Sequence, residues 1–444
     1  MEYKGLALAT TATGSFMSTT EATEVNIAYP VLVKVFNTDI STVVWLGIAY
    51  FLVSVGLLLT FGWVGDATGR GRVYVWGLAI FTLGLVLNSL AMNIYMLIGS
   101  RSFHAVGTAM VLSNGNAITV AAFPPEQRGM GLGLQSAVAG LGLASGPLIG
   151  GVILDALGWR AIFYTRIPLA VVAFLIGWSF LRRGEGARID WLGALLLFLT
   201  IASFLLAINQ AGRSGLMHPL VIAPFALGLV FLPALISVER RTARPVLDLS
   251  LFREPRYTMG LAAIFTIFLT WVGVSLLSPF FMINGMGFSA TKAGLYLTTF
   301  SILRPFFAPL SGWLSDRISR RMITTTAVLV VAAGLGLLTQ VRLDSPEVLL
   351  LTALAISGLG QAFFDPPNNS DILGSVPRDR LGTASASIVA SRQTAMSTGT
   401  ALMGALFAYR AASFAGIRPS EVNPSALPPE AVAAGVKDAF LVAV

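Results

Sequence analysis

Apolar runs long enough to cross a bilayer follow one another along almost the whole chain, and they constrain the fold more than any other feature. A membrane-spanning helix needs about 20 consecutive, mostly apolar residues. Charged residues make up 11% of this chain, whereas a soluble domain has roughly 25%. A transmembrane β-barrel would show short alternating strands instead of continuous apolar runs. The sequence therefore predicts an all-α polytopic membrane protein.

The apolar runs indicate thirteen spans and the start of another. We expect the spans near residues 6–34, 42–64, 73–92, 95–122, 130–157, 163–181, 191–209, 219–238, 258–284, 290–313, 323–340, 347–368 and 383–410. The segment AVAAGVKDAFLVAV (431–444) then begins an apolar helix, which we interpret as a truncated fourteenth span. The first residues, MEYKGLALATTATG, hold one Lys and no clear cleavage site, so we expect a retained first helix and not a signal peptide.

Lys and Arg residues concentrate in alternate loops, among them Arg182, Arg183, Arg240 and Arg241. The opposite loops hold few. The positive-inside rule then places the N-terminus and the basic loops in the cytoplasm, with the chain in the plasma (inner) membrane. Because this topology accounts for the net charge of +8, we expect no nucleic-acid partner.

Two basic loops share one pattern, GWVGDATGRGRV (62–73) and GWLSDRISRRMI (312–323). The repeat predicts two related six-helix halves, 1–182 and 257–444, with residues 183–256 supplying two inserted helices and cytoplasmic linkers. Repeated halves with a site at their interface are typical of secondary transporters. We interpret the loops as cytoplasmic gate motifs, although a plain topogenic loop is the alternative. The candidate gate residues are Gly62, Asp66, Gly69, Arg70, Arg72, Gly312, Asp316, Arg317 and Arg320.

Two acids stand in the first apolar segment. Glu21 and Glu24 are three residues apart and therefore share a helix face. A carboxylate that faced lipid would cost several kcal/mol, so this face is expected to point into the bundle. Such a pair can titrate as a unit, which suits a proton carrier. The alternative is a structural pair satisfied by Arg101 in the fourth span or by neighbouring threonine hydroxyls.

The fifth span contains GLASGPLIGG (142–151). Gly142, Gly146 and Gly150 recur every four residues, so they form a face that allows close helix contact, and Pro147 can bend the helix. Together with the loops, this segment resembles the major facilitator superfamily, and it matches that family's antiporter signature through Gly151. RSFHAVG (101–107) is similar to the family's Arg-x-x-Gln-Gly-x-Gly, with His104 and Ala105 departing.

The first span is similar to the drug:proton antiporter pattern Leu-Asp-x-Thr-x-x-Asn-x-Ala-x-Pro, with Glu21 in the place of Asp and Asn26 retained. Trp45, Tyr50, DWLGALLL (190–197), PPNNS (366–370) and SRQ (391–393) also resemble the 14-helix branch of these antiporters. The resemblance implies the major facilitator fold, two six-helix halves plus two inserted helices, and alternating access. It also implies that Glu21 is the proton site, with Arg101 as a gate on it and Glu24 as an addition to the pattern.

The second half carries Arg304, Asp365 and Arg392 inside apolar segments. A buried Arg needs a partner, and Asp365 is the candidate for Arg304. The alternative is that Arg304 faces the cavity and contacts an anionic group. We assign these three residues, with Asn26, Trp45 and Tyr50, to a substrate cavity. Further aromatics are candidates for its lining or for plain packing, namely Trp271, Phe280, Phe281, Phe363 and Phe364.

The sequence favours a proton-coupled exporter of amphiphilic or cationic small molecules, a drug:H+ antiporter. A lipid or lipid-linked-sugar flippase, or a proton-coupled transporter of a polar metabolite, is the alternative. An enzyme is not expected, because the chain has two histidines, His104 and His218, no metalloprotease motif and no P-loop. We therefore expect no metal and no cofactor beyond the proton gradient. The expected partners are substrate, protons and membrane lipids, with the chain acting as a monomer.

Overall fold

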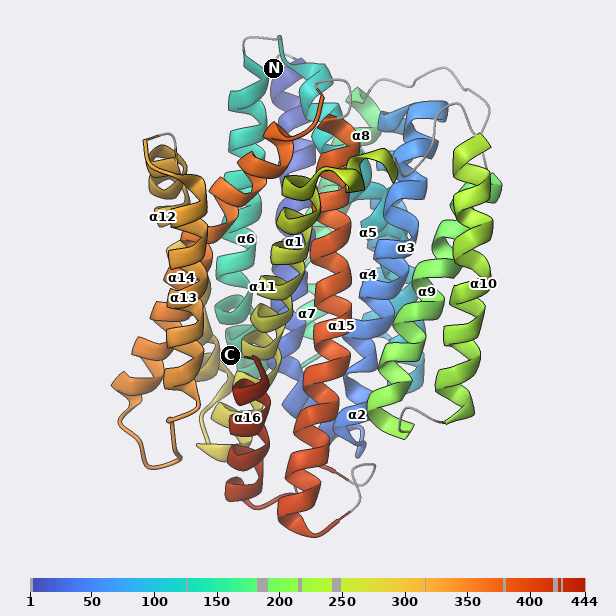
Figure 1. Ribbon diagram of the computed structural model, residues 1–444. Helices are drawn as coiled ribbons and strands as arrows, with labels where there is room; N and C mark the ends of the chain where they lie inside the picture. The colour runs from blue at the N-terminus through green and yellow to red at the C-terminus, as the bar shows by residue number, and fades with distance from the viewer. Residues whose placement is uncertain are drawn as a thin grey trace. The chain divides into compact units, whose positions relative to one another are not determined.

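The computed structural model describes residues 3–124, 127–181, 191–214, 218–241, 249–315, 317–377, 381–417, 422–424 and 426–443. These residues form helices joined by short turns (Figure 1). The α-helices are α1 (Tyr3–Val35), α2 (Ile40–Val43), α3 (Trp45–Thr68), α4 (Arg70–Ser89), α5 (Ile94–Ala122), α6 (Arg128–Leu157), α7 (Ala161–Tyr164), α8 (Ile167–Phe180), α9 (Trp191–Ser214), α10 (Pro219–Arg241), α11 (Pro255–Phe280), α12 (Ala290–Ser315), α13 (Arg320–Leu338), α14 (Glu347–Gly374), α15 (Leu381–Ala415) and α16 (Pro429–Ala443). A 3₁₀ turn η2 (Leu249–Arg253) precedes α11, and a π turn η3 (Phe281–Gly285) extends it. The all-α prediction is confirmed.

Two of the expected spans are divided where the chain turns. The span expected at 42–64 begins as α2, capped by Asp39, whose carboxylate accepts from the Thr42 backbone N–H at 2.9 Å, and it continues as α3. The span expected at 163–181 is split into α7 and α8, with Pro168 in the first turn of α8. Proline suits that position because its fixed φ matches the helix and it has no N–H to leave unpaired.

Nine helical segments among the described residues are long and apolar enough to cross a membrane. α1, α12 and α15 are not among the nine, and these three helices carry four of the charged residues singled out from the sequence. Glu21 and Glu24 lie on α1, Arg304 lies on α12 and Arg392 lies on α15. The 14-span plan with a truncated last span therefore stays a prediction.

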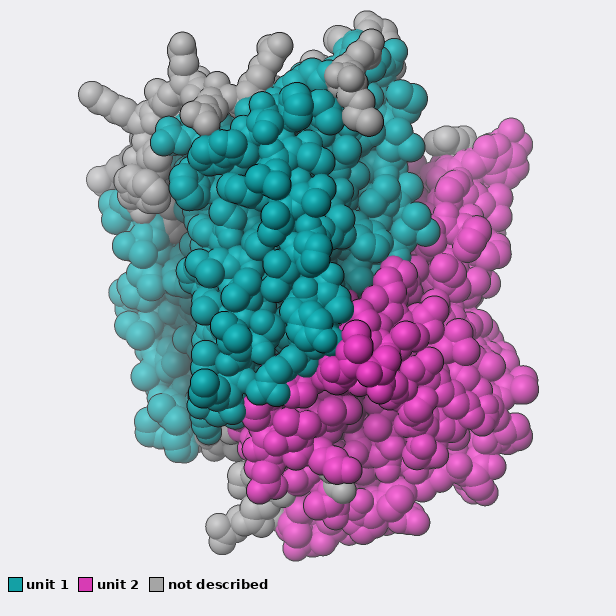
Figure 2. Space-filling view, turned by 180° about the vertical axis from the view of Figure 1, so that it is seen from behind, with its two compact units in different colours: residues 1–22, 46–143, 160–247 teal, residues 23–45, 144–159, 248–444 magenta. Residues whose placement is uncertain are grey.

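The described contacts divide the chain into two compact units (Figure 2). The first unit comprises residues 1–22, 46–143 and 160–247, and the second comprises residues 23–45, 144–159 and 248–444. These boundaries pass through α1 and α6. The division into 1–182, 183–256 and 257–444, which the loop repeat suggested, follows whole helices and stays a prediction.

Within the first unit, α4 packs against α5 and α8, and α9 pairs with α10 (Figure 1). Leu52 of α3 packs with Ala202 and Leu205 of α9 in one apolar cluster. Gly56 of α3 faces the Phe198 ring so closely that a Cβ there would overlap it. Residues predicted as an insertion thus attach to α3 through α9.

Within the second unit, α11 packs against α15, and α14 packs against both α12 and α13. α16 lies along α15 and also contacts α11 and η3. Phe280 of α11 stacks on Phe407 of α15 at 5.7 Å between ring centroids. These contacts hold the helices that carry Arg304, Asp365 and Arg392 together.

Candidate functional site

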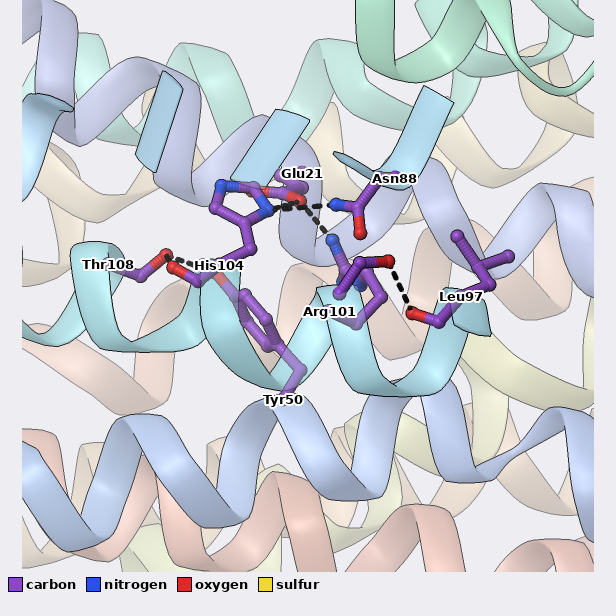
Figure 3. Close-up of polar contacts among 8 residues, drawn as sticks. Glu21, Tyr50, Asn88, Leu97, Arg101, His104 and Thr108 are labelled. Carbon is purple, nitrogen blue, oxygen red and sulfur yellow. Dashed lines mark hydrogen bonds and ion pairs between the residues drawn. The ribbon is translucent and has the colours of Figure 1, made fainter. Parts of the chain in front are cut away.

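Glu21 lies at the centre of a buried polar cluster in the first unit (Figure 3). Its side chain is fully buried, and its Oε1 accepts a hydrogen bond from Arg101 Nη1 of α5 in an ion pair. A single buried carboxylate would be costly, and the guanidinium supplies its compensating charge. The structure shows the ion pair between Arg101 and Glu21 that was one alternative for Arg101. Its role as a gate stays a prediction.

His104 joins the same carboxylate. Its Nδ1 lies 3.0 Å from Glu21 Oε1 and 3.2 Å from Asn88 Nδ2 of α4. The ring is fully buried, packs edge-on against Phe81 at 4.2 Å, and leaves Nε2 without a hydrogen-bond partner among the described residues. The sequence marked His104 as a departure from the family pattern but did not assign it to the site. The available signal was its spacing, because residues three apart on a helix share a face and His104 follows Arg101 by three.

Two aromatic rings hold the Arg101 guanidinium in place. Its Cζ lies 4.3 Å from the Tyr50 ring centroid and 5.9 Å from that of Phe163. The Tyr50 hydroxyl donates to Thr108 Oγ1 at 3.2 Å. Tyr50 was assigned to the substrate cavity, and the structure places it, 2% exposed, beneath Arg101. A cation over an aromatic face is attracted by the ring electrons, so this packing fixes the direction of the guanidinium.

Arg166, the residue before α8, is 8% exposed, so its guanidinium is not at a surface where lipid headgroups would reach it. It interacts electrostatically with Glu21.

The glycine face of α6 packs against α1. A Cβ at Gly142 would lie 2.7 Å from Phe16 O, and a Cβ at Gly150 would lie 2.5 Å from Glu24 Cγ. Gly146 is buried between them, and Pro147 lies inside the helix. The motif that resembles the antiporter signature thus contacts the helix that carries both acids. Glu24 is itself fully buried.

Arg304, Asp365 and Arg392 come together in the second unit. Arg304 forms an ion pair with Asp365 Oδ2, and Arg392 Nη2 lies 3.9 Å from Asp365 Oδ1. The ring of Phe268 on α11 lies under both guanidiniums, with centroid distances of 5.8 Å to Arg304 Cζ and 4.6 Å to Arg392 Cζ. The bridge proposed between Arg304 and Asp365 is present, and Arg392 is a second cation on the same acid.

The other cavity candidates differ in exposure. Asn26 and Trp45 are half-buried, and Asn26 Nδ2 donates to Ser275 Oγ at 2.8 Å. Trp271, Phe280, Phe281 and Phe364 are buried among neighbouring helices, and Phe363 is half-buried. In this structure the four buried rings are part of the packing.

In the first loop motif, Gly69 has φ +104 and is the single residue between α3 and α4. An L side chain rarely adopts this conformation, so glycine is required by the turn. Gly62 of the same motif does not mark a close approach of two helices, because a Cβ there would lie 3.7 Å from Ser113 Cβ, which is ordinary contact. The close approach is at Gly65, where a Cβ would lie 2.8 Å from Asn114 Cγ.

The charged residues of the two loop motifs differ in their contacts. Arg70 and Arg72 are exposed at the start of α4. Arg317 Cζ lies 3.8 Å from the Trp313 ring, and Arg320 Nη1 donates to Asp371 Oδ1 at 3.3 Å. At Gly312 a Cβ would meet its first neighbour at 4.0 Å. Asp316 and the side chain of Asp66 lie outside the described residues.

The chain is similar to a riboflavin transporter and to a multidrug resistance protein. It is 34% identical over 412 residues to the riboflavin transporter RibZ of Clostridioides difficile, covering 92% of this chain and 89% of that relative. It is 29% identical over 407 residues to the multidrug resistance protein Stp of Mycobacterium tuberculosis, covering 91% of this chain and 76% of the relative.

A solved structure shares the fold. A bacterial homologue of the human lysosomal transporter Spinster, in an inward-facing and unoccupied conformation, aligns with 99% of this chain and 94% of that chain. The TM-score is 0.72 at 15% sequence identity. The model of the Major Facilitator Superfamily matches residues 8–400. The chain is therefore a multi-pass membrane transporter and not an enzyme, and it belongs to the Major Facilitator Superfamily.

Proposed function

We propose that this chain is a proton-coupled exporter, of the 14-helix drug:proton antiporter type, that moves amphiphilic small molecules out of the cytoplasm by alternating access. The observation that carries the proposal is the buried cluster of Glu21, Arg101 and His104. Acids inside membrane-spanning segments commonly mark proton relays. Similarity to a riboflavin transporter and to a multidrug resistance protein supports an organic small-molecule substrate. The plasma membrane and a cytoplasmic N-terminus belong to the same proposal.

The cluster has two arrangements, which differ in the position of one proton. With Glu21 ionised, Arg101 pairs with it and a protonated His104 Nδ1 donates to the same oxygen. When the Nδ1 proton of His104 moves to Glu21 Oε1, the carboxylate loses its charge and the pair with Arg101 weakens. His104 Nδ1, once without its proton, accepts from Asn88 Nδ2 instead. Proton arrival therefore changes the partners of Arg101 and His104, and this change can be linked to movement of α1 relative to α4 and α5.

The proton gradient supplies enough free energy for this work. One charge that crosses a potential of 100 mV gains about 2.3 kcal/mol, and each unit of pH difference adds about 1.4 kcal/mol. A factor of ten in concentration costs about 1.4 kcal/mol. One or two protons per cycle thus sustain a substantial substrate gradient.

The Arg304, Asp365 and Arg392 cluster favours a second candidate, the transport of a lipid or a polar metabolite with an acidic group. Its net charge would not attract a purely cationic substrate. Both candidates use the same alternating-access cycle, and they differ in the substrate that is carried.

The test is transport by Glu21→Gln in proteoliposomes under an imposed pH gradient, with riboflavin and ethidium as probes. We expect the wild-type chain to move at least one probe and Glu21→Gln to fall to the level of protein-free liposomes, because glutamine holds no transferable proton. Glu21→Asp keeps a carboxylate and should retain transport. Glu430→Gln, the same change at the exposed start of α16, is the matched control.

Folding is checked separately, because removing one partner of a buried ion pair costs about 3–5 kcal/mol. Size-exclusion chromatography and thermal unfolding of each variant provide that check. Gradient-driven transport by a folded Glu21→Gln at the wild-type rate would exclude Glu21 as the proton site.

A further inference from the structure

Three ionised side chains from three helices meet in the second unit with unequal charges. Arg304 of α12 and Arg392 of α15 both approach the single carboxylate of Asp365 on α14. Two guanidiniums and one carboxylate sum to a net charge of +1. A structural salt bridge needs one cation and one acid. Arg304 and Asp365 already form such a bridge, so a structural role does not explain the second cation, Arg392.

Arg392 is the less satisfied of the two cations. Its Nη2 lies 3.9 Å from Asp365 Oδ1, whereas an N–H···O hydrogen bond spans roughly 2.7–3.2 Å. Its Nε has no hydrogen-bond partner among the described residues. A guanidinium presents five N–H donors in a planar fork that matches a carboxylate or a phosphate group. Arg392 thus keeps most of that fork available.

The two arginines lie deep in their helices. Arg304 is 11 residues before Ser315, the last residue of α12, and Arg392 is 11 residues after Leu381, the first residue of α15. At 1.5 Å per residue each lies about 16 Å from that helix end. Their side chains are 20% and 26% exposed, against 8% for Asp365. Because a lipid-facing arginine at this depth costs several kcal/mol, the exposed part is expected to face a hydrated space.

We propose that Arg304 and Arg392 form a binding site for the acidic group of the transported substrate, a carboxylate or a phosphate on an otherwise apolar or aromatic molecule. Asp365 serves as the counter-charge when the site is empty, and a monoanionic group brings the cluster to neutrality. The ring of Phe268 lies beneath both guanidiniums and limits the directions in which they point. This inference rests on the proposed transport function and names the substrate class as organic anions or zwitterions.

The test measures binding by the purified full-length chain in a neutral detergent, without a proton gradient. The probes are 1-naphthoate and 1-naphthamide, which share a ring system and differ in charge, and isothermal titration calorimetry gives both affinities. We expect naphthoate to bind at least about tenfold more tightly, since a hydrogen bond to a charged group contributes about 1.5–3 kcal/mol and each 1.4 kcal/mol is tenfold.

Two substitutions should act in opposite directions. Arg392→Gln should remove the preference for naphthoate. Asp365→Asn should increase it, because the cluster then carries two positive charges and no acid. Arg392→Lys, which keeps the charge without the fork, should retain part of the preference. Arg410→Gln is the control, since Arg410 lies on the same helix but is half exposed and pairs with Asp438 of α16. If Asp365→Asn does not fold, the double variant Arg304→Gln/Asp365→Asn keeps Arg392 and the charge of +1.

A lipid headgroup offers the same chemistry as a soluble anion, and a second experiment separates the two sources. In nanodiscs that contain phosphatidylglycerol, native mass spectrometry should show retained lipid in the wild type and its loss in Arg392→Gln if the occupant is a headgroup. Retained naphthoate without retained lipid identifies a soluble anion.

Three results would overturn the site: equal affinity of the wild type for naphthoate and naphthamide with no retained lipid, an unchanged preference in Arg392→Gln, or weaker naphthoate binding by a folded Asp365→Asn. Since Glu21→Gln should still bind naphthoate, a failure of proton coupling and a failure of the anion site give different results.

Discussion

At the scale of single residues, the proposed proton coupling depends on the partners of one carboxylate, Glu21. Glu21 could be identified from the sequence because an acid in an apolar segment is rare and expensive. Arg101 could be named as its partner for the same reason. His104 was missed, since an isolated histidine in a membrane helix has many possible surroundings, and the rotation of α5 that points it at Glu21 depends on packing. The contact of Arg392 with Asp365 depends on packing in the same way.

His104 should set the pH dependence of transport. Its Nδ1 lies 3.0 Å from Glu21 Oε1, the oxygen that takes up the proton in the proposed mechanism. The charged or titratable groups around it are Glu21, Arg101 and Tyr50, together with Arg166, which interacts electrostatically with Glu21. Because this imidazole would then no longer exchange a proton with Glu21, we expect His104→Gln to fold, to keep the pair of Arg101 with Glu21, and to show a flatter dependence of the rate on pH than the wild type.

The measurement is the initial rate of probe uptake in proteoliposomes at several external pH values with a constant pH difference. His218→Gln is the matched control, because His218 is the other histidine of the chain and lies exposed in the turn before α10. If His104→Gln keeps the wild-type profile, His104 is a packing residue and carries no proton.

At the scale of the helices, the positions of most helices could be predicted from the sequence, because a helix that crosses a membrane needs a long apolar run. The expected spans and the observed helices agree within a few residues at most boundaries, as with 95–122 and α5 (Ile94–Ala122). The division of α7 from α8 was not predicted, because Arg166 and Pro168 interrupt an otherwise apolar run only locally. The tight contact at Gly65 was also missed, since any of several glycines in the motif could have faced α5.

The glycines of the first loop motif should differ in their tolerance of alanine. Gly69→Ala places a Cβ at φ +104, which costs about 1–3 kcal/mol in unfolding free energy. Gly62→Ala and Gly312→Ala meet their first neighbours at 3.7 Å and 4.0 Å, so neither change should destabilise the protein, and the higher helix propensity of alanine should stabilise each by up to about 1 kcal/mol. Thermal unfolding in detergent compares the three variants. Equal destabilisation of Gly69→Ala and Gly62→Ala would show that the backbone at residue 69 is not constrained as the structure indicates.

At the scale of the whole molecule, the proposed cycle requires contacts that break and re-form. One candidate lies inside the second unit, where Asp155 near the end of α6 accepts hydrogen bonds from the backbone N–H groups of Ala290 and Thr291 at 3.2 Å and 2.7 Å. This carboxylate caps the start of α12, as acids do at helix N-termini. Next to it, Gly151 packs on the Ala290 carbonyl and Gly294 packs on that of Pro147, without room for a Cβ. If α6 and α12 belong to different moving halves, this capped contact is a closed gate.

A disulfide between residues 155 and 291 should therefore stop transport. The chain has no cysteine, so the double variant Asp155→Cys/Thr291→Cys can form no other disulfide within the chain. The side chain at 155 already reaches the backbone at 291, which suits the short span of a disulfide. We expect oxidation to link α6 to α12 and to block probe uptake, and reduction to restore it, because alternating access requires this contact to open. The control pair Ala411→Cys/Gly435→Cys joins α15 to α16, where a Cβ at 435 would lie 3.1 Å from Ala411 Cβ. Both of its residues lie in 257–444, so its disulfide should leave transport unchanged. Full transport by the oxidised 155–291 pair would mean that α6 and α12 move together, and the rocking halves would then have to be divided elsewhere.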